Sequence, residues 1–127
     1  MRYLLDTHVI IWYLEASAEL PEEAEALIDN PEEDVCICVV SLWEIAIKMN
    51  LGKLTLSLTL DELLDNIITR NFHIIQIENE HLLNLLKMPY IHKDPFDRLL
   101  ISTALAEDLT ILTADENIQK YDVPWLW

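Results

Sequence analysis

Four acidic residues each lie where a short aliphatic run meets the expected start of a helix, and together they could hold a divalent metal ion. They are Asp6, Glu44, Asp97 and Asp115. Carboxylates without a histidine or cysteine partner offer only oxygen ligands, which Mg²⁺ and Mn²⁺ prefer, and these ions also bind phosphate oxygens readily. Such a site favours phosphoryl chemistry, in which metal-activated water attacks phosphorus and the metal stabilises the leaving oxygen.

Each acid also has a purely structural interpretation, because acidic residues are favoured at the start of a helix. Asp94 is expected to be the N-cap of a helix, with Pro95 at the first helical position and Asp97 three residues after the cap. Ser41 and Glu44 have the spacing of a capping box, which alone would explain the glutamate. The recurrence of the same junction four times favours a shared site over four independent caps.

The predicted strands and helices that position these acids alternate along the chain. Short aliphatic runs predict strands over residues 2–5, 35–40, 73–77 and 110–113, with an edge strand over 123–127. Start and stop signals predict helices over 8–14, 21–30, 42–50, 60–68, 80–87 and 95–106, and a brief last helix capped by Thr113 and Glu116. This alternation implies right-handed crossovers and a parallel sheet with helices on both faces.

In a sheet of this kind, ligands bind outside the carboxyl ends of the strands. Asp6, Glu44 and Asp115 follow predicted strands, and Asp97 heads a helix that leads into one. We therefore expect the four acids to converge on one pocket. Two carboxylates 5 Å apart repel by about 3 kcal/mol at an effective dielectric constant of roughly 20, and a divalent cation would relieve this repulsion.

Composition limits the other functions that the chain could have. Its 127 residues predict a single domain over 1–127, and its net charge of −15 argues against a broad basic surface for nucleic acid. The single glycine, Gly52, excludes a P-loop and a dinucleotide-binding turn. Cys36 and Cys38 are expected to be buried free thiols. We expect a cytoplasmic protein, because neither a secretory leader nor a membrane-length apolar run is recognisable.

The acids lie in motifs that resemble those of PIN-domain ribonucleases, in particular the VapC-like toxins of toxin–antitoxin pairs. These motifs are L-L-D-T-H around Asp6, S-L-W-E-I-A-I-K around Glu44, D-P-F-D-R-L-L-I around Asp97 and T-A-D ending at Asp115. The resemblance extends over nearly the whole chain and includes the 18-residue step from Asp97 to Asp115. It implies a three-layer α/β domain of the PIN type, with a short parallel sheet of four to five strands, and a Mg²⁺- or Mn²⁺-dependent endoribonuclease.

Carried over by position, the resemblance assigns metal binding and catalysis to Asp6, Glu44, Asp97 and Asp115. It implies accessory roles for Thr7, Ser41, Thr113 and Arg98, of which the arginine would anchor its helix or contact a phosphate. His92 and Lys93 are candidates for RNA contact. The resemblance also implies a homodimer and a small antitoxin partner, and the acidic surface favours an antitoxin with basic residues.

Two other classes of function remain open from the residues alone. One is a metal-dependent phosphohydrolase that is not a nuclease. A phosphatase with an aspartyl nucleophile at Asp6 would need a second acid two residues later, where this sequence has His8. The other is a non-catalytic acidic binding module in which the acids only cap helices.

Overall fold

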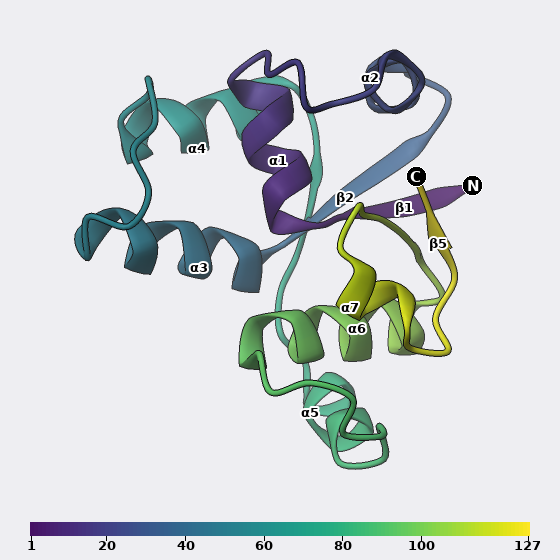
Figure 1. Ribbon diagram of the computed structural model, residues 1–127. Helices are drawn as coiled ribbons and strands as arrows, with labels where there is room; N and C mark the ends of the chain where they lie inside the picture. The colour runs from purple at the N-terminus through teal and green to yellow at the C-terminus, as the bar shows by residue number, and fades with distance from the viewer.

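In the computed structural model, which describes residues 1–127, parallel strands form one sheet with helices on both faces (Figure 1). The strands are β1 Arg2–Leu5, β2 Asp34–Cys38, β3 His73–Ile75, β4 Thr110–Leu112 and β5 Trp125–Leu126. Their order in the sheet is β3-β2-β1-β4-β5, and every neighbouring pair is parallel. The predicted α/β class and the parallel sheet of four to five strands are confirmed.

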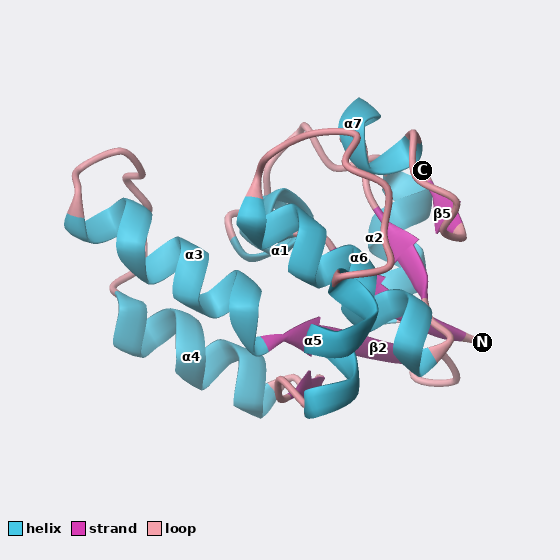
Figure 2. Cartoon of the chain, turned by 90° about the horizontal axis from the view of Figure 1, so that it is seen from below, coloured by secondary structure: helices cyan, strands magenta, loops and turns pink.

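Helices connect the strands and form the two outer layers (Figures 1 and 2). They are α1 Thr7–Leu14, α2 Glu22–Asp29, α3 Val39–Asn50, α4 Leu60–Thr69, α5 Asn79–Leu85, α6 Pro95–Glu107 and α7 Glu116–Gln119. One face of the sheet packs against α1, α2 and α4, and the other packs against α6 and α7 with α5 alongside α6. No helix is long and apolar enough to cross a membrane.

The central strands supply two separate hydrophobic cores, because successive side chains of a strand point to opposite faces of the sheet. In β1, Leu4 belongs to the core with α6 and Leu5 to the core with α1. In β2, Cys36 and Cys38 face the first core and Ile37 faces the second. Both cysteines are buried and free, as predicted, and burial raises the pKa of the Cys36 thiol to about 11. The two thiols therefore serve as packing groups.

Several helix ends lie where short-range signals predict them. Thr59 and Glu62 form the expected capping box at the start of α4. Asp94 caps α6 by accepting two backbone N–H groups of the first turn, at 2.9 and 3.1 Å, and Pro95 occupies the first helical position. After α3, Gly52 adopts a positive φ of 71°, which favours glycine. These ends depend on residues only a few positions apart, so the sequence alone reveals them.

The boundary between β2 and α3 differs from the prediction. The strand expected over 35–40 ends at Cys38, which is itself the N-cap of α3. The predicted capping box of Ser41 and Glu44 is therefore wrong, since both residues lie inside the helix. The reason is tertiary packing: α3 packs against α1 and α6, and its start at Val39 places Ser41 and Glu44 against Thr7 of α1. These contacts outweigh the preference of β-branched residues for a strand.

The cap of the last helix also differs from the prediction. We expected Thr113 and Glu116 to cap it, but Asp115 is the N-cap of α7, and its Oδ1 accepts the backbone N–H of Asn117 at 2.8 Å. The Thr113 hydroxyl instead donates to Asp6, which follows the neighbouring strand, and accepts the backbone N–H of Asp115. Thr113 therefore links the end of β4 to Asp6, and the cap lies two residues later.

Candidate active site

Asp6 is held at the point where β1 and β4 end side by side. Its backbone N–H donates to the carbonyl of Leu112 at 3.1 Å, and its Oδ2 accepts the Thr113 hydroxyl at 2.8 Å. The residue is 2% exposed. Burial raises the pKa of Asp6 to about 6, with a further increase from the charge of Asp115, although the Thr113 hydrogen bond opposes the change. Asp6 makes no side-chain cap to α1, so the capping interpretation does not explain it.

Glu44 reaches the same region from α3 and is also almost fully buried. Thr7 Oγ1 lies 2.8 Å from Glu44 Oε1 and 2.9 Å from Ser41 Oγ. Because a carboxylate only accepts hydrogen bonds, the Thr7 hydroxyl donates to Glu44. Lys48, one helical turn further on, places its Nζ 2.6 Å from Glu44 Oε2. Both oxygens of this buried acid are thus occupied, and its charge is paired.

Asp97 lies in the first turn of α6, and its carboxylate accepts no helix-capping hydrogen bond. Burial raises the pKa of Asp97 to about 8, and the charges of Asp94, Asp6, Asp115 and Glu44 add to the increase, in that order. The four predicted acids therefore lie close enough to repel one another, and Asp94 joins them as a fifth. The structure brings the four together, as expected, at the carboxyl end of the sheet.

Asp115 has both a structural role and a place in this cluster. Its Oδ1 caps α7, while its backbone N–H donates to Thr113 Oγ1 at 2.9 Å. Its charge contributes to the raised pKa of both Asp6 and Asp97. Helix capping therefore explains Asp94 and part of Asp115, whereas Asp6, Glu44 and Asp97 have no such explanation.

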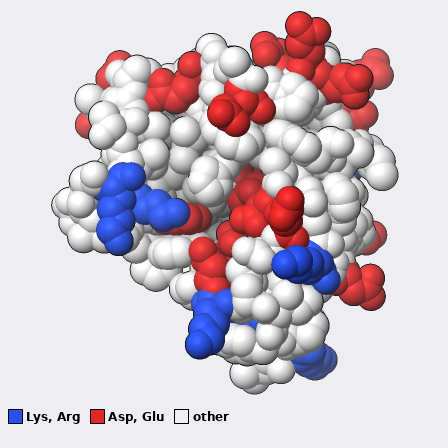
Figure 3. Space-filling view, in the orientation of Figure 1, with Lys and Arg blue, Asp and Glu red and all other residues white.

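The surface over these residues is open. Figure 3 shows acidic side chains gathered in a hollow between α1, α3 and α6, with lysine and arginine side chains around its edge. The cationic residues do not fill the hollow: within it, the only ion pair between a lysine or arginine and one of the four acids joins Lys48 to Glu44. The hollow therefore concentrates negative charge at a place that solvent can reach.

His92 contacts the cluster directly at Asp97 and is held there by a buried tyrosine, Tyr121, that the sequence did not reveal. Tyr121 Oη lies 3.3 Å from the backbone N–H of His92, 3.1 Å from Arg98 Nη1 and 2.8 Å from His92 Nδ1. The first two groups are donors, so the Tyr121 hydroxyl donates its own proton to Nδ1. The neutral His92 ring then carries its proton on Nε2, which lies 3.1 Å from Asp97 Oδ2. His92 thus orients Asp97, and an RNA contact by either ring nitrogen would require one of these bonds to break.

The other two predicted basic residues have different positions. Arg98 is buried, and its Nη1 donates to the carbonyl of Pro89 and to Tyr121, while its guanidinium lies 4.1 Å from the centre of the Tyr90 ring. Of its two predicted roles, these contacts support the anchor for α6. Lys93 is exposed beside the N-terminus of α6, where it lines a pocket with Tyr90. Its predicted RNA contact stays a prediction.

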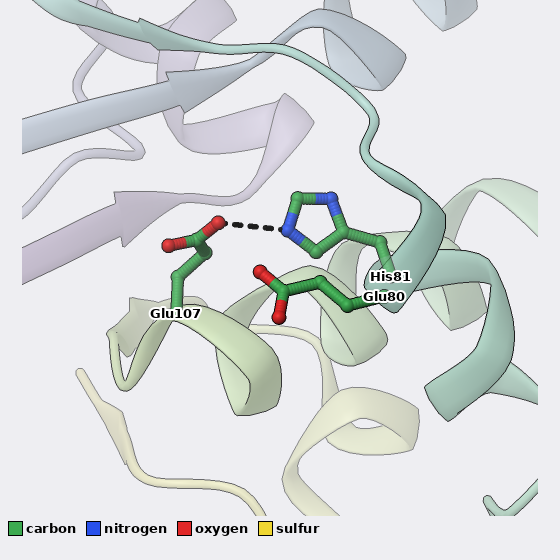
Figure 4. Close-up of side chains that lie close together, drawn as sticks. All are labelled: Glu80, His81 and Glu107. Carbon is green, nitrogen blue, oxygen red and sulfur yellow. Dashed lines mark hydrogen bonds and ion pairs between the residues drawn. The ribbon is translucent and has the colours of Figure 1, made fainter.

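A separate cluster of possible ligands lies at the junction of α5 and α6. Glu80, His81 and Glu107 point toward one another (Figure 4), and they are the only trio of such side chains with ligand atoms within 4.8 Å of one another. His81 Nδ1 accepts the backbone N–H of Glu78 at 3.0 Å, so the neutral ring carries its proton on Nε2 and donates it to Glu107 at 2.9 Å. A metal ion would need that nitrogen free of its proton. The trio is therefore a structural link between two helices, and it lies outside the candidate site.

Comparison with known proteins places this architecture in a family. The PIN domain family model matches residues 3–124. Among solved structures, the chain resembles VapBC2 from Rickettsia felis bound to a DNA fragment from its promoter, with 16% identity, a TM-score of 0.76 and coverage of 99% of this chain and 98% of that one. FitAcB from Neisseria gonorrhoeae matches with 18% identity, a TM-score of 0.68 and coverage of 98% and 96%.

A further solved structure, VapBC-1 from nontypeable Haemophilus influenzae, matches with 18% identity, a TM-score of 0.65 and coverage of 99% and 97%. No curated protein matches this chain. At such identities the structural likeness establishes the fold, and it agrees with the resemblance drawn from the four sequence motifs. Since the family model covers nearly the whole sequence, the chain belongs to the PIN domain family.

Proposed function

We propose that this protein is a Mg²⁺- or Mn²⁺-dependent endoribonuclease and the toxin of a toxin–antitoxin pair. The main support for this proposal is that Asp6, Glu44, Asp97 and Asp115 converge in one hollow. Three of them, Asp6, Glu44 and Asp97, cap no helix. Burial raises the pKa of both Asp6 and Asp97, and neighbouring acids add to the increase, so keeping these carboxylates ionised destabilises the fold. Binding a divalent cation is a direct reason to retain them.

The donor set of this cluster fits a hard divalent ion. Asp6, Glu44, Asp97 and Asp115 offer only carboxylate oxygens, and the neighbouring His92 presents a protonated Nε2, which cannot ligate. These four acids would hold the ion. When bound, Mg²⁺ or Mn²⁺ supplies an activated water as nucleophile and stabilises charge on the leaving oxygen.

The protein's own residues hold the acids in place for this chemistry. Thr113 positions Asp6, Thr7 positions Glu44, and His92 positions Asp97, each by one hydrogen bond between 2.8 and 3.1 Å. Rigid support of this kind is what a metal site requires, since small displacements of its ligands weaken both binding and catalysis. Lys48 balances one of the negative charges of the cluster, that of Glu44.

The shape of the site favours a polymeric phosphodiester over a small phosphate ester. The acids lie in an open hollow, across which a strand can pass (Figure 3). The main alternative, a phosphohydrolase with Asp6 as the nucleophile, lacks the second acid at position 8, which is His8. We therefore take RNA as the substrate class, in line with the PIN-domain resemblance.

The partner proposal depends on the solved relatives. The R. felis and H. influenzae matches are VapBC proteins, and a further match is a toxin–antitoxin complex from Klebsiella pneumoniae. We propose that this chain likewise binds a cognate antitoxin, forms a homodimer and acts in the cytoplasm. Large exposed apolar side chains support the presence of protein interfaces, among them Trp43, Leu83, Leu86 and Tyr90.

Cleavage of a labelled single-stranded RNA tests this function. We expect cleavage with Mg²⁺ or Mn²⁺, none in excess EDTA, and none by the Asp97→Asn variant. The matched control is Asp65→Asn, an identical change on the exposed side of α4, which should cleave as wild type does. Full activity in EDTA would contradict the metal mechanism. Hydrolysis of a small phosphomonoester in place of RNA would favour the phosphohydrolase alternative.

A further inference from the structure

A pocket of 290 Å³ lies beside the acidic hollow, between α1, α3 and the connection that follows α3. Its polar and aromatic lining comes from Thr7, His8, Trp12, Lys48 and Lys53. Two of these residues also touch the acidic site, since Thr7 Oγ1 and Lys48 Nζ lie 2.8 and 2.6 Å from the Glu44 carboxylate. The pocket therefore adjoins the acidic site through these two residues.

Two aromatic rings line the pocket, those of His8 and Trp12. They lie one helical turn apart on α1, with ring centres 5.9 Å apart and planes tilted by 38°. Trp127 does not line the pocket, but its ring centre lies 5.8 Å from that of Trp12. Flat π-surfaces that remain partly accessible suit a nucleic-acid base, because every base has a face that can stack.

The cations of the pocket favour an anionic occupant. Lys53 is exposed and makes no ion pair with any acid, although the chain carries 23 acidic residues against 8 basic ones. Lys48 adds a second ammonium group, which is held by Glu44. An unpaired lysine next to stacking rings is the combination that binds single-stranded nucleic acid, in which the backbone contacts the cation and the base contacts the ring.

We propose that this pocket is a nucleotide-binding subsite for single-stranded RNA, which deepens the ribonuclease function proposed above and rests on it. A base stacks on Trp12 and His8, Lys53 contacts an adjacent phosphate, and the strand then enters the acidic hollow past Thr7. The subsite discriminates against duplex RNA, because the faces of paired bases are already covered by their neighbours.

Two measurements on the full chain test the subsite. The first is the fluorescence anisotropy of a labelled single-stranded oligoribonucleotide in EDTA, which does not depend on cleavage. The second is the KM and kcat of cleavage with Mg²⁺. We expect Trp12→Leu and Lys53→Gln each to weaken binding about tenfold and to raise KM similarly with little change in kcat. Trp12→Phe should retain most of the affinity because it keeps a stacking ring.

The matched control for the lysine is Lys87→Gln, an exposed lysine after α5 and outside the pocket, which should bind RNA as wild type does. Thermal unfolding identifies any variant that fails to fold. If Trp12→Leu is one of them, Lys53→Gln decides the proposal. A normal RNA affinity and KM in both folded variants would overturn the subsite, and loss of antitoxin binding alone would assign the pocket to a protein.

The same data separate the subsite from the parent function. Metal-dependent cleavage that is unaffected in the Trp12 and Lys53 variants would overturn the subsite and leave the nuclease standing. RNA binding that depends on both residues, without any cleavage, would support the subsite and overturn the nuclease. Neither binding nor cleavage of RNA would overturn both.

Discussion

His92 Nε2 lies 3.1 Å from Asp97 Oδ2, and the proton on that nitrogen is fixed by a hydrogen bond at the opposite side of the ring, from the hydroxyl of Tyr121. Asp97 has the most strongly raised pKa of the four acids, and it is thus oriented by His92, which we predicted from the sequence to contact RNA. A positioning residue and an RNA contact affect different kinetic constants, so the two roles can be separated.

If His92 positions Asp97, replacing it should lower kcat and leave the KM for RNA nearly unchanged. We expect His92→Leu to lower kcat by about 10-fold or more, as is typical for a group that orients a metal ligand. His92→Gln should recover part of the rate because its amide can donate to Asp97. Steady-state kinetics measures both constants. A raised KM with an unchanged kcat would instead support the RNA contact.

Removing a repelling charge should stabilise the metal-free protein. We expect Asp97→Asn to increase the free energy of unfolding in EDTA by about 1–3 kcal/mol, since the carboxylate lies among four other acids. The same variant should lose the increase in melting temperature that Mg²⁺ gives the wild type. The contrasting variant is Thr59→Ala, which loses the cap of α4 without removing a charge and should destabilise by about 1 kcal/mol. Urea unfolding in EDTA compares them, and a destabilised Asp97→Asn would argue for four separate caps.

The raised pKa values also predict how stability depends on pH without metal. The folded pKa values of Asp97 and Asp6, about 8 and about 6, lie above the unfolded value near 4. The native state therefore binds a proton at each of these two residues more tightly than the unfolded state does. Protonation stabilises the fold by its full amount below about pH 4, and this stabilisation is lost as the pH rises through 6 and 8. In EDTA the melting temperature should rise as pH falls from 8 to 5.

Two controls accompany the pH series. Asp97→Asn should remove most of the change between pH 8 and pH 6, because Asp97 has the higher pKa. Saturating Mg²⁺ should oppose the trend, since protons and the cation compete for the same oxygens. A melting temperature in EDTA that falls steadily from pH 8 to pH 5 would show that the acids are not coupled as described.

The Thr113 hydroxyl should contribute to stability through two contacts. It donates to Asp6 Oδ2 and accepts the backbone N–H of Asp115, at 2.8 and 2.9 Å, in a fully buried position. Thr113→Val retains the shape and leaves both partners unsatisfied, so we expect a loss of about 2 kcal/mol in urea unfolding. Thr113→Ser retains the hydroxyl and should lose less. A Thr113→Val variant as stable as wild type, with the loss confined to Thr113→Ser, would mean that the methyl group, not the hydroxyl, is important.

Local features of this fold follow from the sequence alone. The Thr59–Glu62 box, the Asp94 cap with Pro95, and the turn at Gly52 each depend on residues a few positions apart. Alternating strands and helices also predicted the parallel sheet. Because parallel strands present their carboxyl ends at one edge, the sequence further predicted that the four acids would meet.

Only the tertiary structure decided what each side chain contacts. His92 and Tyr121 are 29 residues apart, and Thr113 and Asp6 are 107 apart, so no local pattern relates either pair. Packing of α3 against α1 and α6 moved the start of α3 and placed Ser41 next to Thr7 instead of at a cap. Hydrogen bonds and burial between distant segments depend on how the layers pack, and packing energy exceeds the small local preferences that a sequence pattern reports.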